Sequence, residues 1–345
     1  MRYRFYTTSK KAWDGMFKAI SEAKESIYLE MYIFLDDTKI THDFLGMLKS
    51  KALSGLEVVI IADAYGSREL KSSAINELKA AGIEFIFFSH WLRHTHRKFL
   101  IIDKKIAFLG GVNIEEKIRN WRDLQIRLKG KIVKPILKSF AYAYKMSGGK
   151  KISILQYNDY SFTKILKSWF LDNWSNTQHS YYLNNYYRTK IIEAQKSIQL
   201  VTPYLLPPRW LLALLDNAVR RGVSVEIIMP QVTDIFALNK INYLNACRMS
   251  DFGVKCYFMP IMTHAKLMLV DGEEGVIGSQ NLDVLSFGLN MEAGIFFRQK
   301  DIISSLSHLI NKWRNEAVLF LPKNQKIFWW DRFLISIFKL FYPIF

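Results

Sequence analysis

The sequence predicts an α/β protein built from two copies of one structural unit, and three features of the chain point to this. Predicted strands alternate with predicted helices, which is the order of a sheet with helices packed on its faces. The same order of elements returns in the second half, and a short polar motif occurs once in each half. We therefore expect two duplicated α/β/α halves with mixed, mostly parallel sheets, packed pseudo-twofold around one active site, and a C-terminal amphipathic segment.

Apolar spacing and glycine stops define the elements of the first half. Apolar residues at helical spacing predict helices, and nearly continuous runs rich in β-branched and aromatic residues predict buried strands. The expected elements are a helix over 10–25 after Ser9, a strand over 26–34, a helix around 41–53 that ends at Gly55, a strand over 56–63, a helix that ends before Gly82, and a strand over 83–88.

Three stretches of the first half return 167 to 171 residues later. The matched ranges are 23–34 with 194–205, 54–63 with 221–230, and 81–88 with 252–259. The whole unit is therefore duplicated, and we expect a first half over 1–150, a second half over 151–322 and a tail over 323–345. The join lies in 146–190, where KMSGGKK has linker chemistry. The aromatic and polar stretch 168–187 has no clear period, so no structure is predicted for it.

The polar motif has the same spacing in both halves. The first copy contains His96, Lys98 and Asp103, and the second contains His264, Lys266 and Asp271. An asparagine follows each histidine by seventeen residues, at Asn113 and Asn281. A lone buried histidine is usually structural, but two copies with the same spacing and the same tail indicate a duplicated active-site element.

These residue types suit chemistry on a phosphodiester. Residues two apart in an extended strand share one face, so each copy presents an imidazole beside an ammonium group. If the two copies meet, the cations can hold the non-bridging oxygens and stabilise charge in the transition state. One imidazole can attack phosphorus while the other protonates the leaving oxygen. Histidine fits both roles because its pKa lies near neutrality.

The paired motifs, with the words HRKFLIID, WRD, TPY and GSQNLD, resemble the phospholipase D superfamily, and bacterial cardiolipin synthases most of all. The resemblance implies that His96 is the nucleophile and that Asp123 and Glu292 orient the histidines. Asn113 and Asn281 could be turn residues only, but their matched position after a strand and a small pair favours contact with phosphate oxygens. Within the motif, Asp103 and Asp271 are counted with the catalytic residues. Because they sit at strand ends beside turns, we expect them to hold the backbone and not to touch substrate.

The resemblance implies phosphatidyl transfer: two phosphatidylglycerol molecules give cardiolipin and glycerol through a phosphohistidine intermediate, without metal or other cofactor. A metal site at His90, His94 and His96 is a weaker reading, since no matching cluster precedes His264. Three alternatives remain open, namely a phospholipid hydrolase, a nuclease and a non-catalytic binding protein. The acceptor lipid and the oligomeric state are not predicted.

Composition favours an anionic partner and a membrane surface. The formal net charge is +17, which suits nucleic acid or acidic lipid. The two cysteines, Cys247 and Cys256, form no metal-binding pattern, and neither a signal peptide nor a spanning segment is expected. The tail over 327–345 predicts an interfacial helix, with packing on the protein's own core or on a second subunit as the alternative. The stretch 89–94 is a second candidate contact. We expect a peripheral or monotopic enzyme on the cytoplasmic face of a bacterial inner membrane, with no nucleic acid partner.

Overall fold

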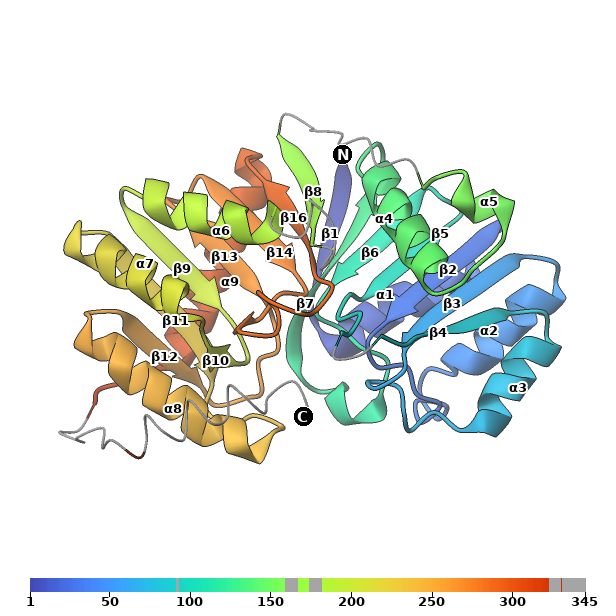
Figure 1. The fold of residues 1–345 in the computed structure, drawn as a ribbon, viewed down its shortest axis with the longest axis horizontal. Coiled ribbons are helices and arrows are strands. Elements are labelled where there is room, and N and C mark those ends of the chain that lie inside the picture. The colour runs from blue at the N-terminus through green and yellow to red at the C-terminus, as the bar shows by residue number, and fades with distance from the viewer. Residues whose placement is uncertain (91–92, 159–166, 174–181, 323–329, 331–345) are drawn as a thin grey trace. The chain divides into compact units, whose positions relative to one another are not determined.

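A computed structural model describes the chain except for residues 91–92, 159–166, 174–181, 323–329 and 331–345. The chain divides into two compact units, Met1–Phe170 and Leu171–Phe345. Figure 1 shows a sheet flanked by helices in each unit. Apart from Trp330, the predicted tail helix over 327–345 lies outside the described residues, as do Trp91 and Leu92 of the second candidate contact.

The first unit is built around a seven-stranded sheet with the order β1-β7-β6-β5-β2-β3-β4. Its elements are β1 (Arg2–Thr8), α1 (Ser9–Ser21), β2 (Ser26–Met31), α2 (Phe44–Leu53), β3 (Glu57–Asp63), α3 (Ser72–Ala80), β4 (Glu84–Phe88), β5 (Phe99–Ile102), β6 (Ile106–Gly110), the short 3-10 helix Glu116–Ile118, β7 (Arg122–Lys129), α4 (Val133–Met146) and α5 (Ile152–Leu155).

The second unit is built around an eight-stranded sheet with the order β17-β12-β11-β9-β13-β14-β16-β8. Its elements are β8 (Ser168–Asp172), which crosses the division between the units, α6 (Tyr182–Glu193), β9 (Ser197–Val201), β10 (Leu205–Leu206), α7 (Arg209–Arg220), β11 (Ser224–Pro230), α8 (Phe236–Asp251), β12 (Lys255–Met259), β13 (Leu267–Val270), β14 (Glu274–Gly278), β15 (Leu282–Asp283), β16 (Ala293–Phe297), α9 (Lys300–Glu316) and β17 (Val318–Leu319).

The strand orders confirm the duplication and extend it. Reading the first sheet from β4 to β1 gives the same succession as the second from β12 to β8. The pair β8 and α6 therefore occupies the place of β1 and α1. These two elements contain residues 168–172 and 182–187 of the stretch that had no predicted structure, and 174–181 lie outside the described residues. The edge strand β17 is an addition of the second sheet, where it pairs antiparallel with β12.

The sheets are mixed, as predicted, but the expectation of mostly parallel pairing was wrong. Parallel neighbours are confined to β2-β3-β4 in the first sheet and to β9-β11-β12 in the second, apart from the short pair β10 and β15. The remaining registered pairs are antiparallel, beginning with β5 against β2 and β6. The reason lies in the connections, because a tight turn returns the chain beside the strand it has just left, whereas parallel strands need a helical crossover.

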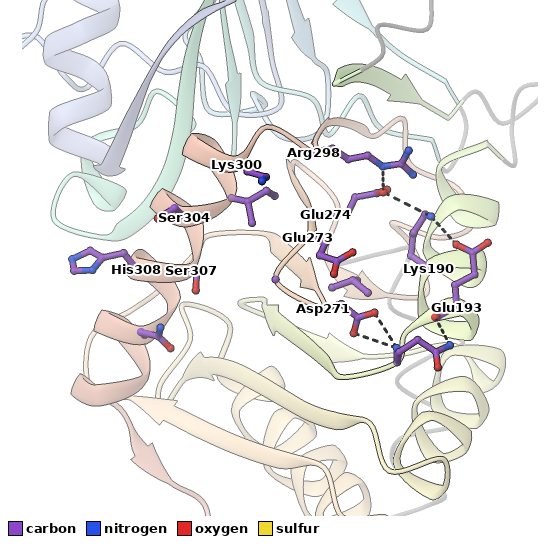
Figure 2. A pocket seen from close by; sticks show the side chains of 15 residues that line it. Lys190, Glu193, Asp271, Glu273, Glu274, Arg298, Lys300, Ser304, Ser307 and His308 are labelled. Atoms are coloured by element: carbon purple, nitrogen blue, oxygen red, sulfur yellow. Dashed lines mark hydrogen bonds and ion pairs between the residues drawn. The ribbon is translucent and has the colours of Figure 1, made fainter.

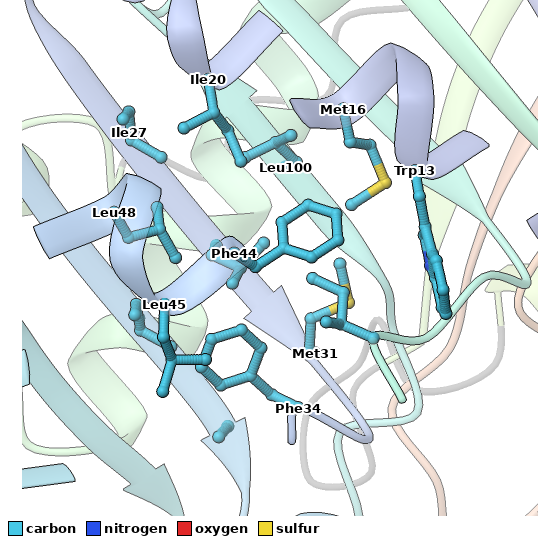
Figure 3. Packing of buried hydrophobic residues seen from close by; sticks show 14 of the residues in the cluster. Trp13, Met16, Ile20, Ile27, Met31, Phe34, Phe44, Leu45, Leu48 and Leu100 are labelled. Atoms are coloured by element: carbon cyan, nitrogen blue, oxygen red, sulfur yellow. The ribbon is translucent and has the colours of Figure 1, made fainter. Parts of the chain in front are cut away.

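The core of the first unit lies between the sheet and helices α1 and α2. Trp13, Met16 and Ile20 are fully buried along one face of α1. Figure 3 shows them with Phe44 and other apolar side chains from α2, β2 and β5. The indole nitrogen of Trp13 donates to the backbone carbonyl of Asn113 at 2.8 Å. The core thus fixes the backbone of a residue predicted to bind phosphate.

Candidate active site

His96 and Lys98 lie immediately before β5, and both are buried. The exposed fractions are 7% for His96 and 0% for Lys98. The Lys98 ammonium donates to the backbone carbonyl of His96 at 2.5 Å, so the lysine folds back beside the histidine. The ring of Tyr32 lies 4.9 Å from the His96 ring, and the Lys98 ammonium lies 5.0 Å from the Tyr32 centroid. A cation and an imidazole are therefore held together by local geometry.

The second unit repeats this arrangement before β13. His264 is 4% exposed and Lys266 is 1% exposed. The Lys266 ammonium donates to the backbone carbonyl of His264 at 2.5 Å, the same contact as in the first unit. Here the aromatic neighbour is Tyr204, one residue beyond the position that the strand registers make equivalent to Tyr32, with its ring centroid 6.2 Å from that of His264. The duplicated motif thus produces duplicated geometry, and the predicted pairing of histidine and lysine occurs in each unit.

The two asparagines lie at the same sheet edge as the histidines. In the first unit, β5 and β6 run antiparallel with Phe99 opposite Leu109, so the end of β6 lies beside the start of β5. The side-chain oxygen of Asn113 accepts from the backbone N–H of Ile33 at 3.3 Å, which leaves its amide nitrogen as a donor. In the second unit, the buried side-chain oxygen of Asn281 has no hydrogen-bond partner within the described chain.

The two carboxylates predicted to orient the histidines are fully buried in the corresponding units. Asp123 precedes Leu124 in β7 and accepts from its backbone N–H at 2.7 Å. Glu292 accepts from the hydroxyl of Ser279 and from that of Ser286, the latter at 2.6 Å. Each carboxylate is therefore available as an acceptor at the edge that carries its histidine. Their contact with the histidine rings stays a prediction.

A second buried carboxylate, Asp283, lies near Glu292 and was missed by the sequence reasoning. Its oxygen accepts from the backbone N–H of Ser286 at 2.7 Å. Burial, and then the negative charge of Glu292, raise the pKa of Asp283 to about 6. The signal was its place at the end of the word GSQNLD, two residues after Asn281.

Asp103 and Asp271 lie at the opposite ends of β5 and β13 from the histidines. The Asp103 carboxylate accepts from the backbone N–H groups of Lys24, Glu25 and Ser26 at 2.7 to 3.1 Å. Asp271 accepts from the equivalent groups of residues 195–197 at 2.7 to 3.2 Å. Burial alone would raise both pKa values, but these donors outweigh it and lower them. Both aspartates thus hold the strand before them to the start of its neighbour.

A buried network behind His96 was also missed. Glu30 and Arg97 form an ion pair with 0% side-chain exposure on either side. The only sequence signal was a single acidic residue within the apolar run of β2. Because an unpaired charge in such a strand is costly, Glu30 could have been expected to have a basic partner. The partner itself could not be identified.

Figure 2 shows a hollow of about 1120 Å³ in the second unit, lined by Asp271 and by residues of α6 and α9. Because Asp271 follows β13 and His264 precedes it, the hollow lies at the end of β13 away from His264. Its acids and bases pair with one another, since the buried Glu274 binds Arg298 and lies 3.8 Å from Lys190. The lining has no excess of positive charge to bind a phosphate, since four acids accompany Lys190, Arg298 and Lys300. Among the described residues, no three His, Cys, Asp or Glu side chains lie close enough to hold a metal ion.

Comparison with known proteins gives the family. The profile of the family described as "Cardiolipin synthase, PLD-like domain" matches residues 16–142 and 187–313, one match in each unit. The minor cardiolipin synthase of Bacillus subtilis is 29% identical over 299 residues, covering 82% of this chain and 73% of that protein. The cardiolipin synthase of Clostridium perfringens strain SM101 is 30% identical over 325 residues, covering 87% of this chain and 68% of that protein.

A solved structure supports the fold. Phosphatidylserine synthase of Haemophilus influenzae superimposes with a TM-score of 0.76 at 14% identity, covering 99% of this chain and 93% of that one. Across eight curated relatives, the chain spans 62% to 73% of their length. The family model matches twice, and each match contains one copy of the histidine and lysine geometry. The chain therefore belongs to the cardiolipin synthase family of phospholipase D-like enzymes.

Proposed function

We propose that the protein is a phosphatidyltransferase that makes cardiolipin and glycerol from two molecules of phosphatidylglycerol. The observation that carries the proposal is the repeated site, in which a buried histidine and a buried lysine share one contact in each unit. A phosphodiester needs a nucleophile, an acid and cations for its oxygens, and two such sites supply one set of each. The proposal requires both histidines to reach one phosphorus atom.

The reaction proceeds by two displacements. A nitrogen of His96 attacks the phosphorus of the first phosphatidylglycerol. The bond from phosphorus to the oxygen of the headgroup glycerol breaks, and His264 donates a proton to that oxygen. Glycerol is released, and the phosphatidyl group stays covalently bound to His96. A hydroxyl of the second phosphatidylglycerol then gives its proton to His264 and attacks the phosphorus, which releases His96 and forms cardiolipin. One phosphodiester is exchanged for another, so the reaction needs no nucleotide.

The other polar residues hold the phosphate and the histidines. Lys98 and Lys266 place positive charge beside the non-bridging oxygens, and Asn113 and Asn281 donate from their amide nitrogens. Asp123 and Glu292 fix the tautomers of His96 and His264. Asp103 and Asp271 act through the backbone, because their oxygens accept from N–H groups at the far ends of β5 and β13.

The substrate resides in a membrane, and we propose that the edge carrying His264 faces it. Among the described helices, none has both the length and the apolar character to cross a bilayer. Large apolar side chains nevertheless lie exposed after β11 and β12: Phe236 is 91% exposed, Val232 64% and Ile261 46%. Because β9, β11 and β12 are parallel and β13 runs against β9, these loops share the sheet edge where His264 precedes β13.

We define Val232, Phe236 and Ile261 as the apolar edge. Its occupant in this proposal is the hydrocarbon boundary of a phospholipid bilayer, because the lipid headgroup must reach His264 at the same edge. Apolar side chains entering that boundary bind by the area they remove from water. The formal charge of +17 adds attraction to anionic lipid. The cytoplasmic face of a bacterial inner membrane remains our expectation for the location.

The test of the function is an incubation with phosphatidylglycerol vesicles followed by separation of the lipids. Cardiolipin with an equimolar amount of glycerol supports phosphatidyl transfer. Phosphatidic acid would instead indicate a hydrolase with water as acceptor. A protein that leaves the lipid unchanged would contradict the proposal.

A further inference from the structure

The residues on both sides of His96 are anchored by two buried carboxylates. Glu30 accepts from the Thr95 hydroxyl and, at 2.7 to 2.9 Å, from the Arg97 guanidinium. Asp63 accepts from the backbone N–H of Thr95 at 2.8 Å. Arg97 also donates to the hydroxyl of Ser139 on α4. Because residues 95–97 precede β5, these side-chain hydrogen bonds hold the segment in place of the backbone hydrogen bonds that a strand would make with its neighbour.

The second unit has no counterpart to these anchors. The strand registers set the equivalences, because Glu30 pairs with Phe99 and Val201 pairs with Leu267, each three residues after the catalytic histidine. Position 30 therefore corresponds to Val201, and Arg97 corresponds to Ala265, one residue after His264.

Asp63 is replaced in the second unit as well. Glu30 lies opposite Ile61 and Val201 lies opposite Ile228, so Asp63 and Pro230 are equivalent, each two residues further along. Both acids and the arginine are thus exchanged for residues whose side chains make no hydrogen bonds. The Thr263 hydroxyl donates instead to the backbone carbonyl of Ile261, at 3.0 Å.

The fold does not require the ion pair. The second unit builds the same strand order and the same contact of lysine with histidine with Val201 and Ala265 in these places. A buried ion pair must also overcome the loss of hydration of both charges, so it is a poor source of stability compared with apolar packing. What the pair supplies is a fixed geometry for the backbone on either side of His96.

We infer that Glu30 and Arg97 are positioning residues for His96, and that their absence beside His264 makes the two histidines unequal. The inference rests on the proposed function and assigns its asymmetry to named residues. A nucleophile must approach phosphorus along one line, and an attacking atom displaced by about 1 Å can lose 100-fold in rate. An acid that delivers and retrieves a proton tolerates a less exact position, which fits His264, whose neighbour Ala265 cannot form an ion pair.

The experiment replaces the pair with the residues of the second unit, as Glu30→Val combined with Arg97→Ala. We expect a folded protein in which phosphohistidine formation at saturating phosphatidylglycerol falls about tenfold or more, while KM changes less than about twofold. Arg97→Ala alone should be worse in both rate and stability, because it leaves Glu30 buried without its cation. Arg97→Lys, which keeps the charge and loses the two-pronged contact, should lie between the wild type and the double variant.

The matched control is the ion pair of Glu226 and Arg314, at 3.2 Å, near the start of β11 and so at the opposite end of the strand from the His264 edge. Glu226→Val combined with Arg314→Ala should change melting temperature and leave the rate of phosphohistidine formation unchanged. Rapid-quench measurement of the acid-labile phosphatidyl label gives that rate, and peptide mapping gives its position.

The outcomes separate this inference from the proposed function. Wild-type protein that makes no cardiolipin would contradict the function itself. A wild type that makes cardiolipin beside a double variant with an unchanged rate would overturn the positioning role alone. Label on His264 in the wild type would overturn it as well. If the double variant does not fold, Arg97→Lys decides, and an unaltered rate in that variant counts against the inference.

Discussion

The carboxylate of Asp123 lies so close to Gly111 that a Cβ on residue 111 would come within 2.2 Å of its Oδ1 atom. The second unit has Ser279 at this place, and its hydroxyl donates to Glu292. The two units therefore differ at this position. In the first unit, Gly111 leaves room for the Asp123 carboxylate, whereas in the second unit the Ser279 hydroxyl donates a hydrogen bond to Glu292.

We expect substitutions at Gly111 and at Ser279 to have different effects on the neighbouring carboxylate. Gly111→Ala and Gly111→Ser should each displace Asp123, with a loss of about 1–3 kcal/mol in unfolding free energy and a marked loss of cardiolipin formation. Ser279→Ala keeps the Cβ and removes one donor to Glu292, for a loss of about 1–2 kcal/mol. Thermal unfolding and product assays measure both effects. A Gly111→Ala protein with wild-type stability would show that the close approach relaxes freely.

His96→Ala and His264→Ala should each lower cardiolipin formation roughly 1,000-fold or more, because each removes a group that makes or breaks a bond. Both variants should retain the far-UV circular dichroism of the wild type. His308→Ala is the control, since that histidine is exposed on α9 and should be neutral in both assays. Appreciable synthesis by either active-site variant would contradict the two-histidine scheme.

Asp103→Asn and Asp271→Asn should destabilise the protein at neutral pH more than they reduce activity per folded molecule. The wild-type carboxylates have lowered pKa values, so the stability they contribute is present above the ordinary value of 3.8 and is lost as the pH falls through the folded value. The difference in melting temperature between wild type and variant should therefore shrink between pH 5 and pH 3. A difference independent of pH would count against this, and a selective loss of turnover would return these aspartates to the catalytic group.

The turn at Asp103 places two successive residues in the left-handed region, since φ is +49° at Asp103 and +56° at Lys104, and in the second unit Asp271 also has φ of +56°. Lys104 has φ of +56°, a left-handed conformation, whereas the equivalent residue of the second unit is Gly272 with φ of +66°. Lys104→Gly should stabilise the first unit by about 0.5–1 kcal/mol, since relief of the Cβ clash exceeds the added chain entropy. Gly272→Lys should destabilise the second unit. Lys104→Ala keeps the Cβ, so it serves as the control and should give no gain in melting temperature.

Changes to the apolar edge should affect vesicle binding before catalysis. Phe236→Ser combined with Ile261→Ser should weaken binding to phosphatidylglycerol vesicles by about tenfold or more, because each apolar side chain contributes about 1.5–3 kcal/mol when buried. Ile192→Ser is the matched control: Ile192 is 53% exposed near the end of α6, which leads into the start of β9 at the other edge of the same sheet. Vesicle flotation measures binding. Equal losses from both variants would argue against a directed edge.

Much of the fold follows from local pattern. The apolar runs predicted β2 and β3 within a few residues, and the glycine stops predicted the ends of α2 and α3. In contrast, β8 and α6 could not be predicted, because their aromatic residues have no period and β8 is defined by its neighbour β16, more than a hundred residues later. Local sequence carries little information about such a distant partner.

The site divides in the same way. Spacing alone predicted His96, Lys98, His264 and Lys266 as candidate site residues, and the place of Asp103 and Asp271 at strand ends beside turns set these two apart. It could not reveal that Arg97 lies against Glu30, because that contact spans 67 residues and depends on the pairing of β2 with β5. The direction of β5 itself was hidden, since the sequence does not state whether a short turn or a crossover follows a strand.

The backbone hydrogen bonds accepted by Asp103 and Asp271 fix the distance along β5 and β13 from each aspartate to its histidine. One end of each strand is attached to the start of its neighbour, and the other end carries the imidazole. Each residue adds about 3.3 Å and alternates the face on which its side chain lies. Inserting or deleting one residue within β5 would therefore move His96 by about that distance and turn it to the opposite face of the sheet. The seven-residue interval from histidine to aspartate therefore sets both the position and the face of the imidazole. A change of two residues would restore the face but would still displace His96 by about 6.6 Å.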